Sequence, residues 1–290
     1  MKNEKIFIFG ASGFIGGYLF NHLKNKCKKV TGTYNQNKKP ELIFFDTANS
    51  SIEELPLDNV KYGVICSTLA NIDSCIKDLN YSNKVNVTGL EKVITKLVKK
   101  DIIPVFISSG AVFDGLTGGY KENDLRNPKN IYGIQKKQME DFMISNLKDY
   151  LILRIGKVFG INKRDNGKIF MDWIEKYKRN EEIKCAYDEE LSLTSIEDAV
   201  KCIEVLLDQN KRGIFHIDSG IHKSRFDFAK DFFDYLKIKD ANLIRCSLDD
   251  FNFSDKRAKK PYLDSSKVIK EIGFSFTSLD RYYEIIKNQI

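Results

Sequence analysis

Short apolar runs alternate with helical spacings over the first half of the chain. The runs read Ile6–Phe9, Lys29–Thr33, Leu42–Phe45, Tyr62–Cys66, Ile103–Ile107 and Leu151–Arg154. They are short, continuous and rich in Ile, Val and Phe, as is typical of parallel strands covered on both faces. Between two of them, Val87, Leu90, Ile94, Leu97 and Val98 keep the three-to-four spacing of an amphipathic helix. The alternation predicts an α/β fold with a doubly wound parallel sheet.

After Gly160 the pattern changes. Helical periodicity covers Ile169–Arg179, Ser195–Leu207 and Phe226–Leu236, Gly213–Ile217 reads as a strand, and Ala258–Leu263 is basic. We therefore expect residues 1–160 to form the sheet domain, with residues 195–220 returning to it. Residues 161–290 are expected to form a smaller C-terminal α/β region that shapes a substrate pocket.

The composition is that of a globular chain, because 42% of the 290 residues are hydrophobic and 30% are charged. No apolar run approaches the roughly 20 residues that cross a bilayer. The N-terminus lacks a signal peptide's long apolar stretch, so we expect a cytoplasmic protein without membrane association. Six cysteines (Cys27, Cys66, Cys75, Cys185, Cys202 and Cys246) form no C-x-x-C pair. They are expected to be reduced thiols, and no metal site is predicted.

The formal net charge is +7. A basic balance raises the hypothesis of nucleic-acid binding. The lysines are spread along the whole chain, however, and no nucleic-acid-binding signature is present. The charge therefore favours an anionic small molecule over nucleic acid as the partner.

A glycine-rich turn, Gly10-Ala-Ser-Gly-Phe-Ile-Gly16, follows the first predicted strand and opens a helix through Leu23. Such a turn lets the backbone approach a pyrophosphate at the positive end of the helix. The alternative is an ordinary strand–helix turn. The position on the first strand favours a nucleotide, and residues 1–160 are predicted to be a Rossmann NAD(P)-binding domain. The expected cofactor contacts are Gly10, Ser12, Gly13, Phe14, Ile15 and Gly16.

The end of the second predicted strand indicates which dinucleotide is bound. An acidic residue that holds the NAD ribose is expected about 20 residues past the glycines. Residues 32–39 contain no acid and end in Lys38 and Lys39, which suits a 2′-phosphate. NADP(H) is therefore the favoured cofactor, and NAD(H) is the alternative. The alternative role for the two lysines is that they only cap a solvated loop. Asp46, after the third strand, is expected to meet the adenine amino group.

Tyr132 and Lys136 stand four residues apart, on one face of a predicted helix. A Lys beside a phenol favours the phenolate and lowers a pKa that otherwise stands near 10. Such a Tyr passes a proton to or from a carbonyl or hydroxyl group. Ser108 and Ser109 follow Ile107 at the end of the fifth predicted strand, where ligands bind in doubly wound sheets. The alternatives are a solvated helix face and a plain Ser-Ser-Gly turn.

In order and spacing these motifs resemble an extended short-chain dehydrogenase/reductase. The similarity is greatest to the dTDP-4-dehydrorhamnose reductase family. It extends over the run Ser108–Gly115, over Tyr120, Glu122, Asp124, Asn127, Pro128 and Asn130, over Leu153–Gly160, Leu193–Ala199 and Gly213–His216, and over Arg257, Pro261, Leu263 and Asp264. Gly110 and Ala111 replace the family's Asp and Tyr, and Cys66-Ser67-Thr68 replaces its Ala-rich turn, so the sugar stays open.

The resemblance implies a role for each matching residue. Tyr132 becomes the acid/base, Lys136 its tuner and the ligand of the nicotinamide ribose, Ser109 the hydroxyl partner, and Asn86 a support for proton relay. Ser67 and Lys38 join the cofactor contacts. The implied substrate contacts are Ser109, Gly110, Arg154, Val158, Arg257 and Lys260.

The implied activity is NAD(P)H-dependent reduction of a 4-keto nucleotide-diphosphate sugar in deoxysugar or polysaccharide biosynthesis. Family members are often dimers, so a homodimer is also implied. Two alternatives stay open: a nucleotide-sugar epimerase of the same fold, and a non-catalytic NAD(P)-binding regulatory subunit.

Overall fold

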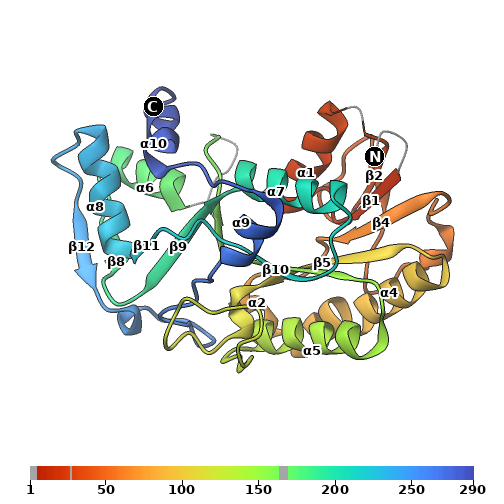
Figure 1. Ribbon diagram of the computed structural model, residues 1–290. Coiled ribbons are helices and arrows are strands. Elements are labelled where there is room, and N and C mark those ends of the chain that lie inside the picture. Colours follow the sequence, from red (N-terminus) through yellow and green to blue (C-terminus); the bar gives the residue numbers. More distant parts are fainter. Residues whose placement is uncertain (1–4, 27, 163–168) are drawn as a thin grey trace.

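A seven-stranded parallel sheet forms the centre of the computed structural model, which describes residues 5–26, 28–162 and 169–290. Its strand order is β10-β6-β5-β4-β1-β2-β3 (Figure 1). The strands are β1 (Lys5–Phe9), β2 (Val30–Tyr34), β3 (Ile43–Phe44), β4 (Val60–Ile65), β5 (Ile103–Ser109), β6 (Leu151–Ile155) and β10 (Gly213–Ile217). This arrangement confirms the predicted doubly wound α/β fold.

Helices cover both faces of the sheet because alternate strand residues point to opposite sides. Ile6 and Ile8 join one core with α1 (Phe14–Asn25), α7 (Ile196–Asp208) and α9 (Ser266–Ile272). Phe7 and Phe9 join the other core with α4 (Gly89–Lys99) and α5 (Ile131–Asn146). Short helices α2 (Ile72–Lys77), α3 (Leu79–Asn83) and η2 (Lys84–Thr88) lead into α4.

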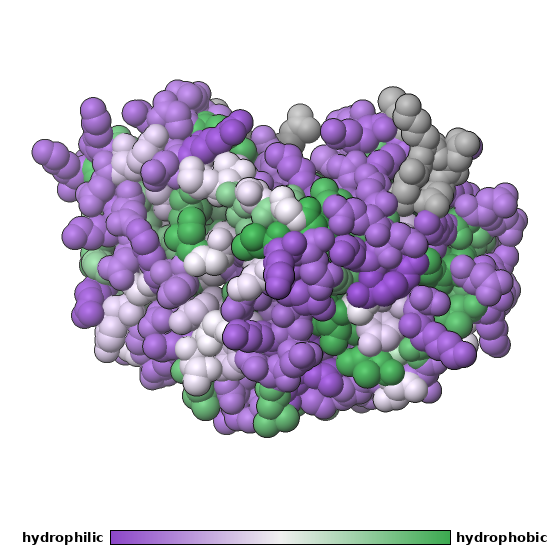
Figure 2. Space-filling model, viewed as in Figure 1, coloured by the Kyte–Doolittle hydropathy of each residue, from purple (hydrophilic) through white to green (hydrophobic). Residues whose placement is uncertain are grey.

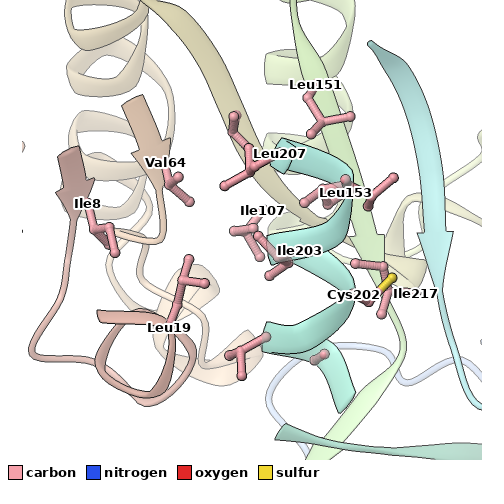
Figure 3. Packing of buried hydrophobic residues seen from close by; sticks show 14 of the residues in the cluster. Ile8, Leu19, Val64, Ile107, Leu151, Leu153, Cys202, Ile203, Leu207 and Ile217 are labelled. Atoms are coloured by element: carbon pink, nitrogen blue, oxygen red, sulfur yellow. The ribbon is translucent and has the colours of Figure 1, made fainter. Parts of the chain in front are cut away.

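In the first of these cores, α7 packs against the middle of the sheet. Figure 3 shows Ile203 and Leu207 of α7 lying over Ile107 of β5 and Leu153 of β6. All four side chains are less than 10% exposed. Removing this apolar area from water fixes α7, and with it the return of the chain to the sheet, against β6 and β10.

A second region follows β6 and has an aromatic core of its own. It contains β7 (Lys157–Phe159), β8 (Ile183–Ala186), β9 (Glu190–Ser195), β11 (His222–Ser224), β12 (Leu243–Cys246), α6 (Ile169–Lys178), α8 (Arg225–Leu236) and α10 (Leu279–Lys287). Single turns complete the chain at η1 (Ile52–Glu54), η3 (Gly110–Val112) and η4 (Leu248–Asp250). The strands pair as β11-β9-β7 and β12-β8. Phe170, Trp173 and Phe232 pack together in the core.

The observed strand ends refine two predictions that concern the site. β5 extends to Ser109, two residues beyond the predicted end, so both serines stand on the sheet. β4 ends at Ile65, which places Cys66 in the loop after it. Five cysteines are free thiols as predicted, and Cys27 lies outside the described residues.

The surface of the molecule is mainly polar. Figure 2 shows hydrophilic residues over most of the face in view, with hydrophobic residues in scattered patches. None of the helices in the described part of the chain is long and apolar enough to cross a membrane.

Candidate active site

The glycine-rich turn between β1 and α1 is closed tightly on its own backbone. Gly10 has φ +81°, and a Cβ there would lie 2.8 Å from the Ser67 amide nitrogen. A Cβ on Gly16 would lie 2.3 Å from the Gly10 carbonyl oxygen. The Gly10 N–H donates to Thr33 Oγ1 at 3.0 Å, which ties the turn to β2. Side chains at Gly10 and Gly16 would therefore displace the backbone.

The first turn of α1 presents its positive end without a protein cap. The N-cap residue Gly13 has no side chain to accept a hydrogen bond, and the first turn carries no acidic residue. Backbone N–H groups at such a helix start bind anions such as a pyrophosphate. Close by, Ser67 Oγ is buried with no hydrogen-bond partner in the described structure. An uncapped helix start and an orphaned hydroxyl fit a dinucleotide cofactor.

A hollow beside the turn extends toward the end of β2. It is lined by Gly10, Ser12, Gly13, Ser67 and residues 35–37. Lys38 is exposed and lies outside this lining. Lys39 instead turns back to α1, where a Cβ on Gly17 would lie 3.8 Å from its Nζ. Of the two lysines, Lys39 is therefore the one that approaches the glycine turn.

The Asp46 carboxylate is occupied within its own turn. Its oxygens accept hydrogen bonds from the Ala48 N–H at 2.9 Å and from Asn49 Nδ2 at 2.7 Å. The neighbouring residues Phe45 and Thr47 line the hollow, whereas Asp46 does not. The structure thus places Asp46 beside the hollow without directing its carboxylate into it.

The predicted catalytic residues meet in one cavity of about 440 Å³. Its lining joins the start of α1, the ends of β4, β5 and β6, the first turns of α5, and α6. The predicted residues among it are Gly13, Phe14, Ile15, Gly16, Ser109, Tyr132, Lys136 and Val158. Four motifs that are far apart in the sequence therefore converge at the carboxyl end of the sheet, where doubly wound folds bind ligands.

Lys136 lines the cavity and is held in place by the end of β5. Its ammonium donates to the Ile107 carbonyl at 2.7 Å and lies 3.5 Å from Thr68 Oγ1. The ammonium also stands 4.5 Å from the centre of the Phe106 ring and 5.6 Å from that of Tyr132. Because burial disfavours the charged form, the pKa of Lys136 is lowered to about 7.

The pKa of the Tyr132 phenol differs from the expectation. Loss of water around the half-buried phenol raises its pKa above the ordinary value, while a hydrogen bond with Ser109 acts in the opposite direction. The prediction of a lowered Tyr132 pKa is wrong for this structure, because burial of the phenol is the largest influence and raises that pKa. At neutral pH the phenol therefore keeps its proton.

Asn86 lies behind the cavity on η2 and is buried. Its Oδ1 accepts from the Leu69 N–H at 2.8 Å, and its Nδ2 donates to the Leu69 carbonyl at 3.0 Å and to Gln135 Oε1 at 2.8 Å. The amide thus fixes the loop after β4 against α5. Its role in a proton relay stays a prediction.

Arg154 was predicted to contact substrate, and the structure corrects this. Its side chain on β6 is 1% exposed. It donates to Glu140 Oε1 at 3.0 Å, to Glu140 Oε2 at 2.7 Å and to the Glu122 carbonyl at 3.0 Å. Because a buried guanidinium requires such partners, Arg154 is part of the core between β6 and α5.

The other predicted substrate contacts lie on or against a segment near the C-terminus. Arg257 donates to Asp73 at 2.7 Å, and Lys260 pairs with Glu190 at 2.8 Å. A Cβ on Gly110 would lie 2.5 Å from the Pro261 carbonyl oxygen, so Gly110 packs against the same segment. None of the three is in the cavity lining, and their role as substrate contacts stays a prediction.

The cavity residues that the sequence analysis did not predict include Lys157, Asp172, Trp173 and Arg225. They lie on the second region and close the end of the cavity away from the glycine turn. Arg225 forms an ion pair with Glu189. Their contribution had no signal in the sequence, because α6 and α8 show only the periodicity of amphipathic helices.

The family model described as "RmlD substrate binding domain" matches residues 4–286. The chain belongs to this family. A probable low-salt glycan biosynthesis reductase, Agl14 of Haloferax volcanii, is 25% identical over 94% of each chain. Methionine adenosyltransferase 2 subunit beta of Xenopus tropicalis is 21% identical over 93% of this chain and 83% of that protein.

Among solved structures, dTDP-4-dehydrorhamnose reductase of Bacillus anthracis in complex with NADP superposes with a TM-score of 0.87. It is 23% identical, and the match covers 99% of this chain and 100% of that one. This likeness supports the fold described above. Within the described residues, no group of three or more His, Cys, Asp and Glu side chains gathers as a metal site.

Proposed function

We propose that the protein reduces a keto carbon of a nucleotide-diphosphate sugar, with NADPH or NADH as hydride donor. The observation that carries this proposal is the convergence of Tyr132, Ser109 and Lys136 on one cavity with the uncapped start of α1. A proton donor, a polarising hydroxyl and an anion site in one cleft are the groups that carbonyl reduction requires. The Haloferax relative, named a reductase, supports the same chemistry.

The cofactor would lie along the carboxyl end of the sheet. The backbone N–H groups at Gly13–Gly16 would hold its pyrophosphate, Ser67 Oγ would gain the partner it lacks, and Lys136 would hold the ribose next to the nicotinamide. When bound, the reduced nicotinamide supplies hydride. The acid-free end of β2 and the inward-turned Lys39 favour NADPH, and the Bacillus anthracis neighbour contains NADP.

Tyr132 would donate the proton that the substrate oxygen takes as the carbonyl becomes an alcohol. Reduction requires this group to begin protonated, and a phenol is protonated at neutral pH already at its ordinary pKa near 10. Ser109 would hydrogen-bond the same oxygen and hold it beside the phenol. Residues 161–290 would shape the sugar end of the cavity through Trp173 and Val158. We favour the C4 carbon of a 6-deoxysugar as the site of reduction.

The test follows NADPH and NADH oxidation with a panel of nucleotide-linked 4-keto sugars. Wild-type protein should consume reduced cofactor with at least one of them. Tyr132→Phe should lower kcat by about 10²- to 10⁴-fold, the contribution of a positioned general acid, while the Kd for NADPH stays within about twofold. Turnover near the wild-type rate in Tyr132→Phe would refute the assignment.

The same experiment separates the alternatives. An epimerase would retain NAD through purification and interconvert two sugars without net oxidation of added cofactor. A regulatory subunit would bind cofactor without consuming it and would co-purify with a partner enzyme, as the name of the Xenopus relative illustrates. Either result would replace the proposed reduction.

A further inference from the structure

The segment Ser254–Asp264, called the strap below, runs between η4 and α9 beside the candidate active site. Its charged side chains are paired with distant parts of the chain. Lys259 Nζ donates to Asp188 and Asp249, each at 2.7 Å, and Lys260 pairs with Glu190 on β9. These contacts anchor one end of the strap on the second region.

The other end of the strap holds the start of α5. Asp255 Oδ2 accepts the Ile131 N–H at 2.8 Å, and the Lys256 carbonyl accepts from Asn130 Nδ2 at 3.1 Å. Asn130 in turn caps the helix by accepting the Gly133 N–H at 2.8 Å. Tyr132 follows directly, so both residues that precede it are bonded to the strap. A carboxylate at this position also complements the positive end of the helix.

The Asp73 carboxylate on α2 fixes the Asp255 end of the strap. Asp73 Oδ1 accepts the backbone N–H of Ser254 at 2.9 Å and that of Asp255 at 3.2 Å. Asp73 Oδ2 accepts from Arg257 Nη2 at 2.7 Å. Three hydrogen bonds to one carboxylate therefore set where the Asp255 side chain stands relative to α5.

The strap also follows the loop that leaves Ser109. The Pro261 carbonyl lies against Gly110, where an added Cβ would come within 2.5 Å. The Lys260 N–H donates to the Gly115 carbonyl at 2.9 Å, and the Asp264 N–H donates to that of Tyr120 at 2.8 Å. The strap thus contacts both the start of α5, which holds Tyr132, and the loop that follows Ser109.

We infer that Asp255 is a positioning residue, through which the strap sets the Tyr132 hydroxyl against Ser109 and the substrate oxygen. This inference rests on the proposed reduction. Because proton transfer depends on distances of a few tenths of an ångström, a displaced helix start should lower kcat more than cofactor binding. The strap contacts no part of the glycine turn in the bonds described, so the pyrophosphate end of the cofactor site should be insensitive to it.

The test compares Asp255→Ala with Asp255→Asn, which keeps one acceptor oxygen, and with Lys259→Ala, which removes the two side-chain hydrogen bonds of Lys259 at the far end of the strap. Asp255→Ala should lower kcat by about 10- to 100-fold while the Kd for NADPH changes less than about twofold. Hydrogen exchange of the Ile131 and Gly133 amides should become faster. Asp255→Asn should restore most of kcat, and Lys259→Ala should match wild type.

Several results would overturn the inference. One is a folded Asp255→Ala protein with wild-type kcat and wild-type exchange at Ile131 and Gly133. Another is a lower melting temperature with an unchanged kcat per folded molecule, which would make the strap merely structural. If wild-type protein oxidises no cofactor with any sugar, the proposed function fails separately. The hydrogen-exchange rates of the Ile131 and Gly133 amides then still test the role of the strap. Equal rates in Asp255→Ala and wild type would refute that role.

Discussion

The buried ion pair between Glu140 and Arg154 allows a quantitative test of the interior behind the active site. The Glu140 side chain is fully buried and that of Arg154 is 1% exposed. Glu140 also accepts from Ser108 Oγ at 2.5 Å and from Arg126 at 3.0 Å. Arg126 also pairs with Asp141 at 2.6 Å, so the removal of Glu140 leaves Arg154 as a buried guanidinium without a carboxylate, whereas the removal of Arg154 leaves Glu140 paired with Arg126.

Glu140→Leu should destabilise the protein by about 3–5 kcal/mol, the cost of stranding a buried charge. Arg154→Met should cost less, about 1–3 kcal/mol, because Arg126 and Ser108 still satisfy Glu140. The double variant should be more stable than Glu140→Leu alone, since no guanidinium then stays in the core without a carboxylate. The two free energies are therefore predicted to be strongly non-additive.

Thermal melts of the four proteins measure this cycle. At about 2 °C per kcal/mol for a chain of this size, Glu140→Leu should lower Tm by roughly 6–10 °C. Circular dichroism at low temperature should show that each variant folds. Additive effects, or a double variant that melts below Glu140→Leu, would refute the reasoning that unpaired charge dominates the cost.

Three further outcomes follow from the geometry. Gly16→Ala should abolish NADPH binding in calorimetry, because its Cβ would lie 2.3 Å from a backbone oxygen; binding at wild-type affinity contradicts the tight turn. Lys39→Ala should weaken NADPH binding about tenfold and leave NADH binding unchanged, whereas Lys38→Ala should alter neither; equal effects of the two variants would argue against the assignment of Lys39. Burial, then Arg154, lowers the pKa of His216 to about 3, so the unfolded chain takes up a proton near pH 6.5 that the folded chain refuses. Stability should therefore fall as the pH drops from about 6.5 toward 3, by up to about 1.4 kcal/mol per pH unit for this group, and His216→Gln should flatten that slope in melts across the window.

The fold was predictable because its signals are local. Each strand of the central sheet appears in the sequence as a short apolar run, whereas the strands of the second region were not predicted. The glycine turn follows the first strand with the spacing that a close backbone approach requires. The i, i+4 pair of Tyr132 and Lys136 likewise needs only the helix period. Features encoded within one turn or one strand could be predicted from the sequence.

The partners of charged residues could not be predicted in this way. Arg257 meets Asp73 across 184 positions, and Arg154 meets Glu140 from a different element. No spacing rule connects such pairs, because the tertiary fold sets them. One signal was available for Arg154, which interrupts the apolar run of β6: an Arg within a covered strand requires a buried acceptor, not a ligand. Desolvation of Tyr132 was equally invisible, since it depends on what covers the phenol.

The order of strands has a consequence for how the chain matures during synthesis. β10 pairs with β6 only after about sixty intervening residues have been made, and the strap emerges later still. The glycine turn, β1 and α1 are complete early, so a nascent chain acquires its nucleotide-binding end first. The bonds from Asp255 to Ile131 and from Asn130 to Lys256 close only after residue 256 has left the ribosome. A chain truncated before the strap would thus retain every residue of the proton-transfer group and still lack the contacts that hold its helix start.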